Sequence, residues 1–229
     1  MKKYYIIGII VAIIIVLILA LRITLSVKKN KEGTETSITS KRNEIIQNKV
    51  NNNKNDNKEV NEMYLTGKHN VEIKIKEFGT IELELDADIA PITVTNFVNL
   101  AKSGFYDGLT FHRIISGFMI QGGDPLGNGY GGNSENIKGE FKANGVENTI
   151  SHTRGTISMA RSSKYDSASS QFFIVHEDSL FLDNQYAGFG HVTNGIDIVD
   201  KICAVTPVED NNGTVLKENQ PVIEYIKVI

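Results

Sequence analysis

The pattern of apolar and polar positions divides this chain of 229 residues into three parts. Residues 4–21 form an uncharged run rich in Ile, Val and Leu, and residues 28–61 are polar and rich in Asn and Lys. Apolar residues return at regular spacing only in the remainder. We therefore predict a membrane-spanning signal anchor over residues 1–27, a flexible linker over residues 28–61, and a folded domain over residues 62–229.

The first apolar run predicts a helix that crosses a membrane. Its 18 residues would span roughly 27 Å as a helix, which is close to the hydrocarbon thickness of a bilayer. No small-x-small cleavage site follows the run, so we expect an uncleaved anchor, with a buried core helix as the alternative.

The charges around this run leave its orientation open. Lys2 and Lys3 precede it, while Arg22 and three lysines follow it, and this count alone favours a cytoplasmic C-terminal side. A short Lys-Lys start resembles an export signal, however, and long domains are less governed by charge. We expect a single-pass protein of the cell membrane whose folded domain lies outside the cytoplasm.

The folded part begins with two stretches that alternate apolar and charged positions, residues 71–76 and 81–85. The turn between them contains Gly79, so they predict a hairpin with one face in water. Pro91 can open a helix. The apolar positions of that helix recur at helical spacing, at Val94, Phe97, Val98 and Ala101. The later apolar runs are short and do not alternate with helices, which indicates a mainly antiparallel sheet or barrel.

Composition and motifs exclude several kinds of function. Residues 1–61 carry a net charge of +6 and the remaining residues −9, so the folded part lacks the basic excess that nucleic acid requires. Cys203 is the only cysteine, and the five histidines lack metal-ligand spacing, so we expect no disulfide, metal or cofactor. Residues 127–132 fit G-x-G-x-x-G, but no strand–helix unit surrounds them, and G-x-S-x-G is absent.

Several short blocks in the folded part carry a family resemblance. Residues 111–124 read FHRIISGFMIQGGD, residues 155–160 read GTISMA, and residues 170–174 read SQFFI. LD at residues 182–183 and FGHV at residues 189–192 follow. In order and spacing these blocks resemble the signature of the cyclophilins, which are peptidyl-prolyl cis-trans isomerases. The resemblance implies a closed eight-stranded antiparallel β-barrel capped by two α-helices.

The resemblance also implies a site for proline-containing polypeptides that needs no cofactor. Arg113 matches the family's catalytic arginine, and Gln121 matches the side chain that holds the substrate backbone. Ala160 matches a residue whose backbone contacts the peptide. The pocket for the proline ring is implied to consist of Phe118, Met119, Phe173 and Leu182.

Three further substrate-binding positions depart from the family pattern. Arg161, Phe181 and Tyr186 stand where the family commonly has Asn, Trp and His. Tyr186 is still aromatic and can donate a hydrogen bond. Loss of the Trp is expected to weaken cyclosporin binding more than catalysis.

These residues suit a reaction without a covalent step. Rotation about an X-Pro bond crosses a barrier of about 18–20 kcal/mol, because the twisted amide loses its resonance. A guanidinium that donates to the proline nitrogen in the twisted state would stabilise that state over the planar one. We therefore expect an isomerase that assists the folding of exported or surface proteins, and we expect it to be a monomer.

Two other hypotheses remain at this point. A tethered module could hold proline segments with little turnover, and the departures at Arg161, Phe181 and Tyr186 leave room for it. A secreted structural protein on the same scaffold would not bind proline peptides at all.

Overall fold

The computed structural model describes residues 64–229. The predicted anchor and linker lie outside the described residues. Within residues 64–229, no helix has the length and apolar character needed to cross a membrane. The described part is mainly β, with two α-helices, α2 (Pro91–Lys102) and α3 (Ile196–Val205).

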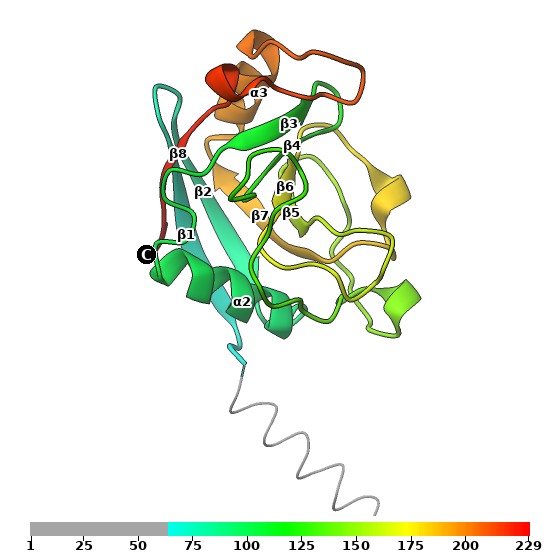
Figure 1. Ribbon diagram of the computed structural model, residues 1–229. Coiled ribbons are helices and arrows are strands. Elements are labelled where there is room, and N and C mark those ends of the chain that lie inside the picture. Colours follow the sequence, from blue (N-terminus) through cyan, green and yellow to red (C-terminus); the bar gives the residue numbers. More distant parts are fainter. Residues whose placement is uncertain (1–63) are drawn as a thin grey trace, which may run out of the picture. The chain divides into compact units, whose positions relative to one another are not determined.

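Eight strands form one sheet in which every neighbouring pair is antiparallel (Figure 1). The order across the sheet is β3-β4-β6-β5-β7-β2-β1-β8. The strands are β1 (Lys68–Ile75), β2 (Gly79–Asp86), β3 (Phe111–Ile115), β4 (Met119–Gly122), β5 (Thr156–Met159), β6 (Phe172–Val175), β7 (Gly188–Asn194) and β8 (Ile223–Val228). Three short 3₁₀ helices, η1 (Lys142–Asn144), η2 (Leu180–Leu182) and η3 (Lys217–Asn219), lie in the connections.

The predicted closed barrel is corrected to a half-barrel. The edge strands β3 and β8 share no ladder, and an isolated bridge between Thr110 and Val222 joins the chain just before each of them. A second isolated bridge, between Arg113 and Thr214, brings the connection after α3 against β3. Because this connection occupies the edge of β3, β8 pairs only with β1.

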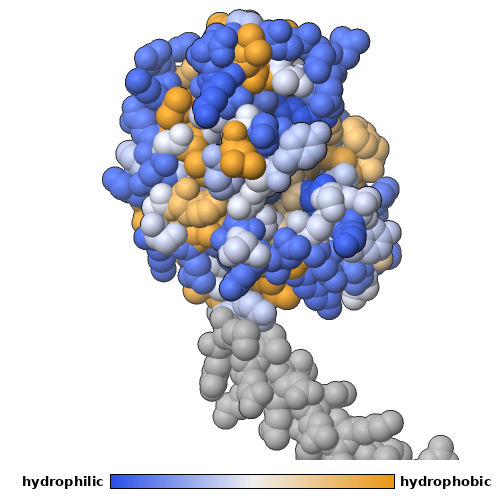
Figure 2. Space-filling model, viewed as in Figure 1, coloured by the Kyte–Doolittle hydropathy of each residue, from blue (hydrophilic) through white to orange (hydrophobic). Residues whose placement is uncertain are grey.

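The core is built as the alternating pattern predicts. Every second residue is buried from Val71 in β1 and from Ile81 in β2, and α2 buries the apolar stripe that begins at Val94. Figure 1 shows α2 and α3 at opposite ends of the sheet. Phe97 of α2 packs its ring 5.1–5.4 Å from those of Tyr106, Phe172 and Phe189. On the face shown in Figure 2, apolar side chains appear only as separate patches among polar ones.

Glu140 caps helix α2 from a distant segment. No side chain at the start of the helix itself caps it. The Glu140 carboxylate, which is buried, accepts hydrogen bonds from Ile92 N at 3.0 Å, from Thr93 N at 2.8 Å and from Thr93 Oγ1 at 2.7 Å. This carboxylate therefore satisfies N–H groups that helix geometry leaves without an internal partner.

Replacing Glu140 with Ala is expected to lower the free energy of unfolding by about 3 kcal/mol, because buried donors lose their acceptor. Urea denaturation monitored by circular dichroism measures this loss. Glu147→Ala removes an exposed carboxylate from the same region and is expected to change the value by less than about 0.5 kcal/mol. A Glu140→Ala loss no larger than this control would contradict the capping role.

Candidate active site

A second, smaller apolar cluster lies apart from the main core. Its buried members are Met119, Phe173, Val175 and Leu182. Strands β4 and β6 pair so that Met119 lies opposite Val175 and Gln121 lies opposite Phe173. The side chains of these four residues are therefore neighbours on the sheet. The short helix η2 adds Leu182 from a later part of the chain.

Three members of this cluster, Met119, Phe173 and Leu182, line a pocket of about 120 Å³. The structure brings nine of the ten predicted site residues together around it: Arg113, Phe118, Met119, Gln121, Ala160, Arg161, Phe173, Leu182 and Tyr186. The tenth, Phe181, does not line the pocket. Its side chain is 67% exposed, and its ring lies 5.5 Å from that of Phe118, so it extends the apolar surface outside the pocket.

Arg113 is held at the edge of the pocket by neutral partners. Its Nε donates to Asn212 O at 2.8 Å and its Nη2 to Asn212 Oδ1 at 3.2 Å, while Nη1 donates to Gln121 Oε1 at 3.2 Å. No carboxylate within residues 64–229 forms a salt bridge with it. Burial lowers the pKa of Arg113, and Tyr186 and Asp210 act in the opposite direction. An arginine stays protonated despite such a shift, so the pocket carries a positive charge that no salt bridge neutralises.

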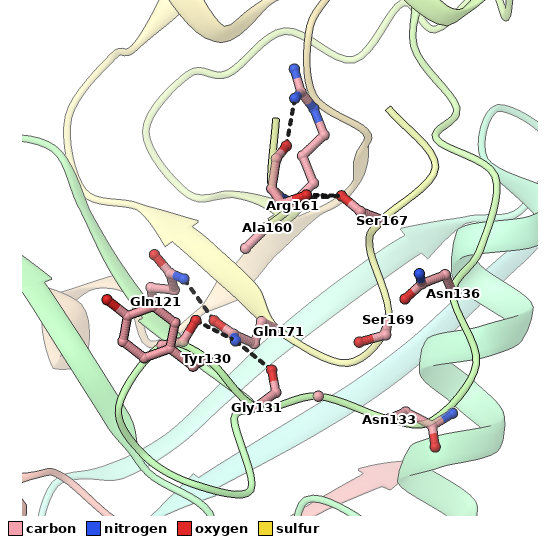
Figure 3. A pocket seen from close by; sticks show the side chains of 13 residues that line it. Gln121, Tyr130, Gly131, Asn133, Asn136, Ala160, Arg161, Ser167, Ser169 and Gln171 are labelled. Atoms are coloured by element: carbon pink, nitrogen blue, oxygen red, sulfur yellow. Dashed lines mark hydrogen bonds between the residues drawn. The ribbon is translucent and has the colours of Figure 1, made fainter. Parts of the chain in front are cut away.

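Gln121 connects the arginine to the glycine-rich loop, which comprises residues 122–132. Its Nε2 donates to Gln171 Oε1 at 2.9 Å, and Gln171 Nε2 donates to Gly131 O at 2.7 Å and Gly129 O at 3.2 Å (Figure 3). This chain of amides fixes the side-chain orientation of Gln121, with its oxygen toward Arg113. Gln171 lies in the predicted SQFFI block, but its side-chain role was not predicted.

Arg161 sits in an aromatic enclosure beside the pocket. Its Cζ lies 4.5 Å from the ring centroid of Tyr186, 5.1 Å from that of Phe141 and 5.2 Å from that of Tyr165. Nε and Nη2 both donate to Gln185 O, and Nη1 donates to Ser162 O. In Figure 3 the guanidinium points away from the neighbouring Ser167 and Asn136. Arg161 therefore contributes its stem, more than its charged end, to the site.

A more polar recess of about 390 Å³ adjoins the pocket (Figure 3). Gln121, Ala160 and Arg161 line both spaces. Side-chain hydroxyls and amides, including those of Asn136 and Ser169, form much of its remaining wall. A chain bound in the pocket can therefore continue over a polar surface on this side.

The glycine-rich loop wraps around the buried carboxylate of Asp124. This carboxylate accepts hydrogen bonds from Leu126 N at 2.8 Å, Asn128 N at 3.0 Å and Gly129 N at 2.6 Å. Burial raises the pKa of Asp124, but the backbone donors outweigh it and hold the pKa below its usual value. Because these N–H groups already have an anionic partner, they do not face a nucleotide phosphate, and the G-x-G-x-x-G match is structural.

Comparison with known proteins agrees with this arrangement. The family model described as cyclophilin type peptidyl-prolyl cis-trans isomerase/CLD matches residues 70–228. The chain is 44% identical over 144 residues to peptidyl-prolyl cis-trans isomerase B of Bacillus subtilis, which covers 63% of this chain and 92% of that protein. It is 46% identical over 136 residues to peptidyl-prolyl cis-trans isomerase A of Dickeya dadantii, which covers 56% and 67%.

A solved structure shares the fold. It is the cyclophilin-type peptidyl-prolyl cis-trans isomerase of Cryptosporidium parvum, determined in the presence of the dipeptide Ala-Pro. Its TM-score is 0.62 at 30% identity, and the match covers 70% of this chain and 98% of that chain. The chain belongs to the cyclophilin-type peptidyl-prolyl cis-trans isomerases.

Proposed function

We propose that this chain isomerises X-Pro bonds in polypeptides, with the proline ring in the apolar pocket and Arg113 as the catalytic residue. One observation carries the assignment of Arg113: its guanidinium lines an apolar pocket and has only neutral hydrogen-bond partners. An unpaired cation beside an apolar pocket costs free energy, so its retention calls for a functional reason. The Ala-Pro dipeptide in the related structure supports a proline-containing ligand.

The arrangement suits electrostatic stabilisation of a twisted amide. In the twisted state the proline nitrogen gains a lone pair, which a guanidinium donor can bind and which the planar ground state lacks. Phe173 and Met119 form apolar walls suited to the ring, while Gln121 and the backbone of Ala160 lie where they can hold the chain on either side of the bond. No cofactor takes part in this scheme.

A binding module with little turnover is the second candidate. The exposed Phe181 and the enclosed Arg161 favour it, since both change the surface on which a flanking chain would lie. Isomerisation of a short free prolyl peptide separates the two candidates. Acceleration of the peptide's cis–trans exchange supports the enzyme, whereas binding of the same peptide without acceleration supports the module.

We also propose that residues 1–27 anchor the chain in the cell membrane and that residues 28–61 tether a monomeric catalytic domain outside the cytoplasm, where it assists exported proteins. The length and apolar character of the first run support this proposal. Protease treatment of intact cells that carry a C-terminally tagged chain tests it. Degradation of the tag from outside is expected, and protection until lysis would reverse the orientation.

A further inference from the structure

A third recess shares part of its wall with the proline pocket. It has a volume of about 590 Å³ and is enclosed by the glycine-rich loop and by residues 212–220. Arg113 and Gln121 line both this recess and the proline pocket. The two spaces are therefore neighbours and share the side chain proposed to be catalytic.

Apolar side chains gather at this recess although they are open to solvent. Leu126, Tyr130 and Leu216 line it, with exposed fractions of 59%, 92% and 42%. Residues 64–229 contain nine exposed large hydrophobic side chains, so a third of them lie on this one recess. Exposed apolar side chains that lie next to one another on a folded domain are typical of a binding surface.

The recess is formed before any ligand arrives. Gln220 Nε2 donates to Gly127 O and to Val215 O, both at 2.9 Å, and so joins the two walls. Leu126 is fixed by its backbone bond to Asp124 at 2.8 Å. A bound chain would therefore meet a preorganised surface and would not have to order the loop.

The charges at the recess limit what it can bind. Arg113 and Lys217 are its permanently charged side chains, and no carboxylate lines it. An apolar side chain in a neutral or acidic segment fits this surface, whereas a basic segment would meet two like charges. Since an extended chain advances about 3.3 Å per residue, a chain whose proline is in the pocket reaches past Arg113 within a few residues.

We propose that this recess is a specificity subsite that binds a large apolar side chain of the substrate, a few residues from the isomerised proline. The preferred substrate is then an unfolded polypeptide segment in which an apolar residue accompanies the proline. Leu126, Tyr130 and Leu216 form the contact surface. This inference rests on the proposed function, because the proline pocket fixes the position from which the bound substrate extends toward the recess.

Two ten-residue peptides test the subsite. Both have one central proline and neutral flanking residues. The Leu peptide carries Leu three residues before and three residues after the proline, and the Ser peptide carries Ser at the same two positions. Wild-type chain is expected to act on the Leu peptide with about tenfold higher kcat/KM than on the Ser peptide, mostly through KM. In Leu126→Ser/Leu216→Ser this preference is expected to fall to about twofold or less, with activity on a prolyl tetrapeptide unchanged.

A matched control is available elsewhere on the surface. Val205→Ser/Val208→Ser replaces side chains that are 58% and 46% exposed and that do not line the recess, so the wild-type preference should remain. Equal kcat/KM for the two peptides in the wild type, or a preference that survives Leu126→Ser/Leu216→Ser, overturns the subsite alone. A wild-type chain inactive on the tetrapeptide overturns the proposed function, and the subsite with it.

Discussion

Arg113→Ala is expected to lower kcat/KM for a prolyl tetrapeptide by about 10²–10³-fold, the loss typical of removing one preorganised donor to a transition state. The loss should fall mainly on kcat, because the guanidinium is proposed to bind the twisted amide more strongly than the planar one. Arg113→Lys keeps the charge but loses the fork that Asn212 and Gln121 hold, so only part of the activity should remain. Exchange spectroscopy or a protease-coupled assay gives both constants.

Arg154 provides the control for the loss of a guanidinium. It pairs with Asp200 at 2.7 Å and Glu177 at 3.7 Å and does not line the proline pocket. Arg154→Ala is therefore expected to lower stability while leaving kcat within about twofold at a temperature where the chain is folded. Unchanged kcat/KM in Arg113→Ala would remove Arg113 from the mechanism.

Local patterns were sufficient to predict the first elements of the folded domain, although these do not carry the site residues. The β1–β2 hairpin and α2 follow directly from alternation and from the stripe that begins at Val94, because each of these elements buries one face against the same core. The site residues were identified only through the family resemblance. Without that resemblance, the apolar side chains of Phe173 and Met119 are equally consistent with ordinary core positions.

Contacts between distant segments could not be predicted in the same way. Asn212 contacts Arg113 across 99 residues of sequence and Gln171 contacts Gln121 across 50, and neither pairing leaves a periodic signal. The open edge of the sheet has the same origin, since it depends on where residues after α3 pack against β3. Phe181 was placed in the site by alignment of a motif, but the conformation of η2 turns its side chain outward.

A buried network of Ser158, His152 and Asp183 supports the pocket from behind. His152 Nδ1 lies 2.8 Å from Asp183 Oδ1, and Nε2 lies 2.9 Å from Ser158 Oγ. The imidazole stacks on the ring of Phe173 with centroids 6.1 Å apart, and Asp183 directly follows Leu182. Ser158 is fully buried, so this group is not a hydrolytic triad; it ties β5, β6 and η2 together beneath the proline site.

His152→Leu is expected to lower the free energy of unfolding by about 3 kcal/mol at pH 7.5, because Ser158 and Asp183 lose a buried partner while the apolar stacking is retained. The same change should raise KM for a prolyl tetrapeptide several-fold, since Phe173 and Leu182 lose the bonds that fix their segments. His69→Leu alters a half-buried histidine outside this network and should change stability by less than about 1 kcal/mol.

The pH dependence of stability separates this network from simple packing. Burial lowers the pKa of His152 from its usual 6.5, and Asp183 opposes the shift without reversing it. Below pH 6.5 the unfolded chain therefore binds more protons at this position than the folded chain, and the free energy of unfolding falls as the pH decreases. One such group contributes at most about 1.4 kcal/mol per pH unit.

His152→Leu lacks this contribution, so the stability difference between wild type and variant should shrink from pH 7.5 to pH 5. Urea denaturation across that range measures it, and a constant difference would show that His152 does not become protonated on unfolding.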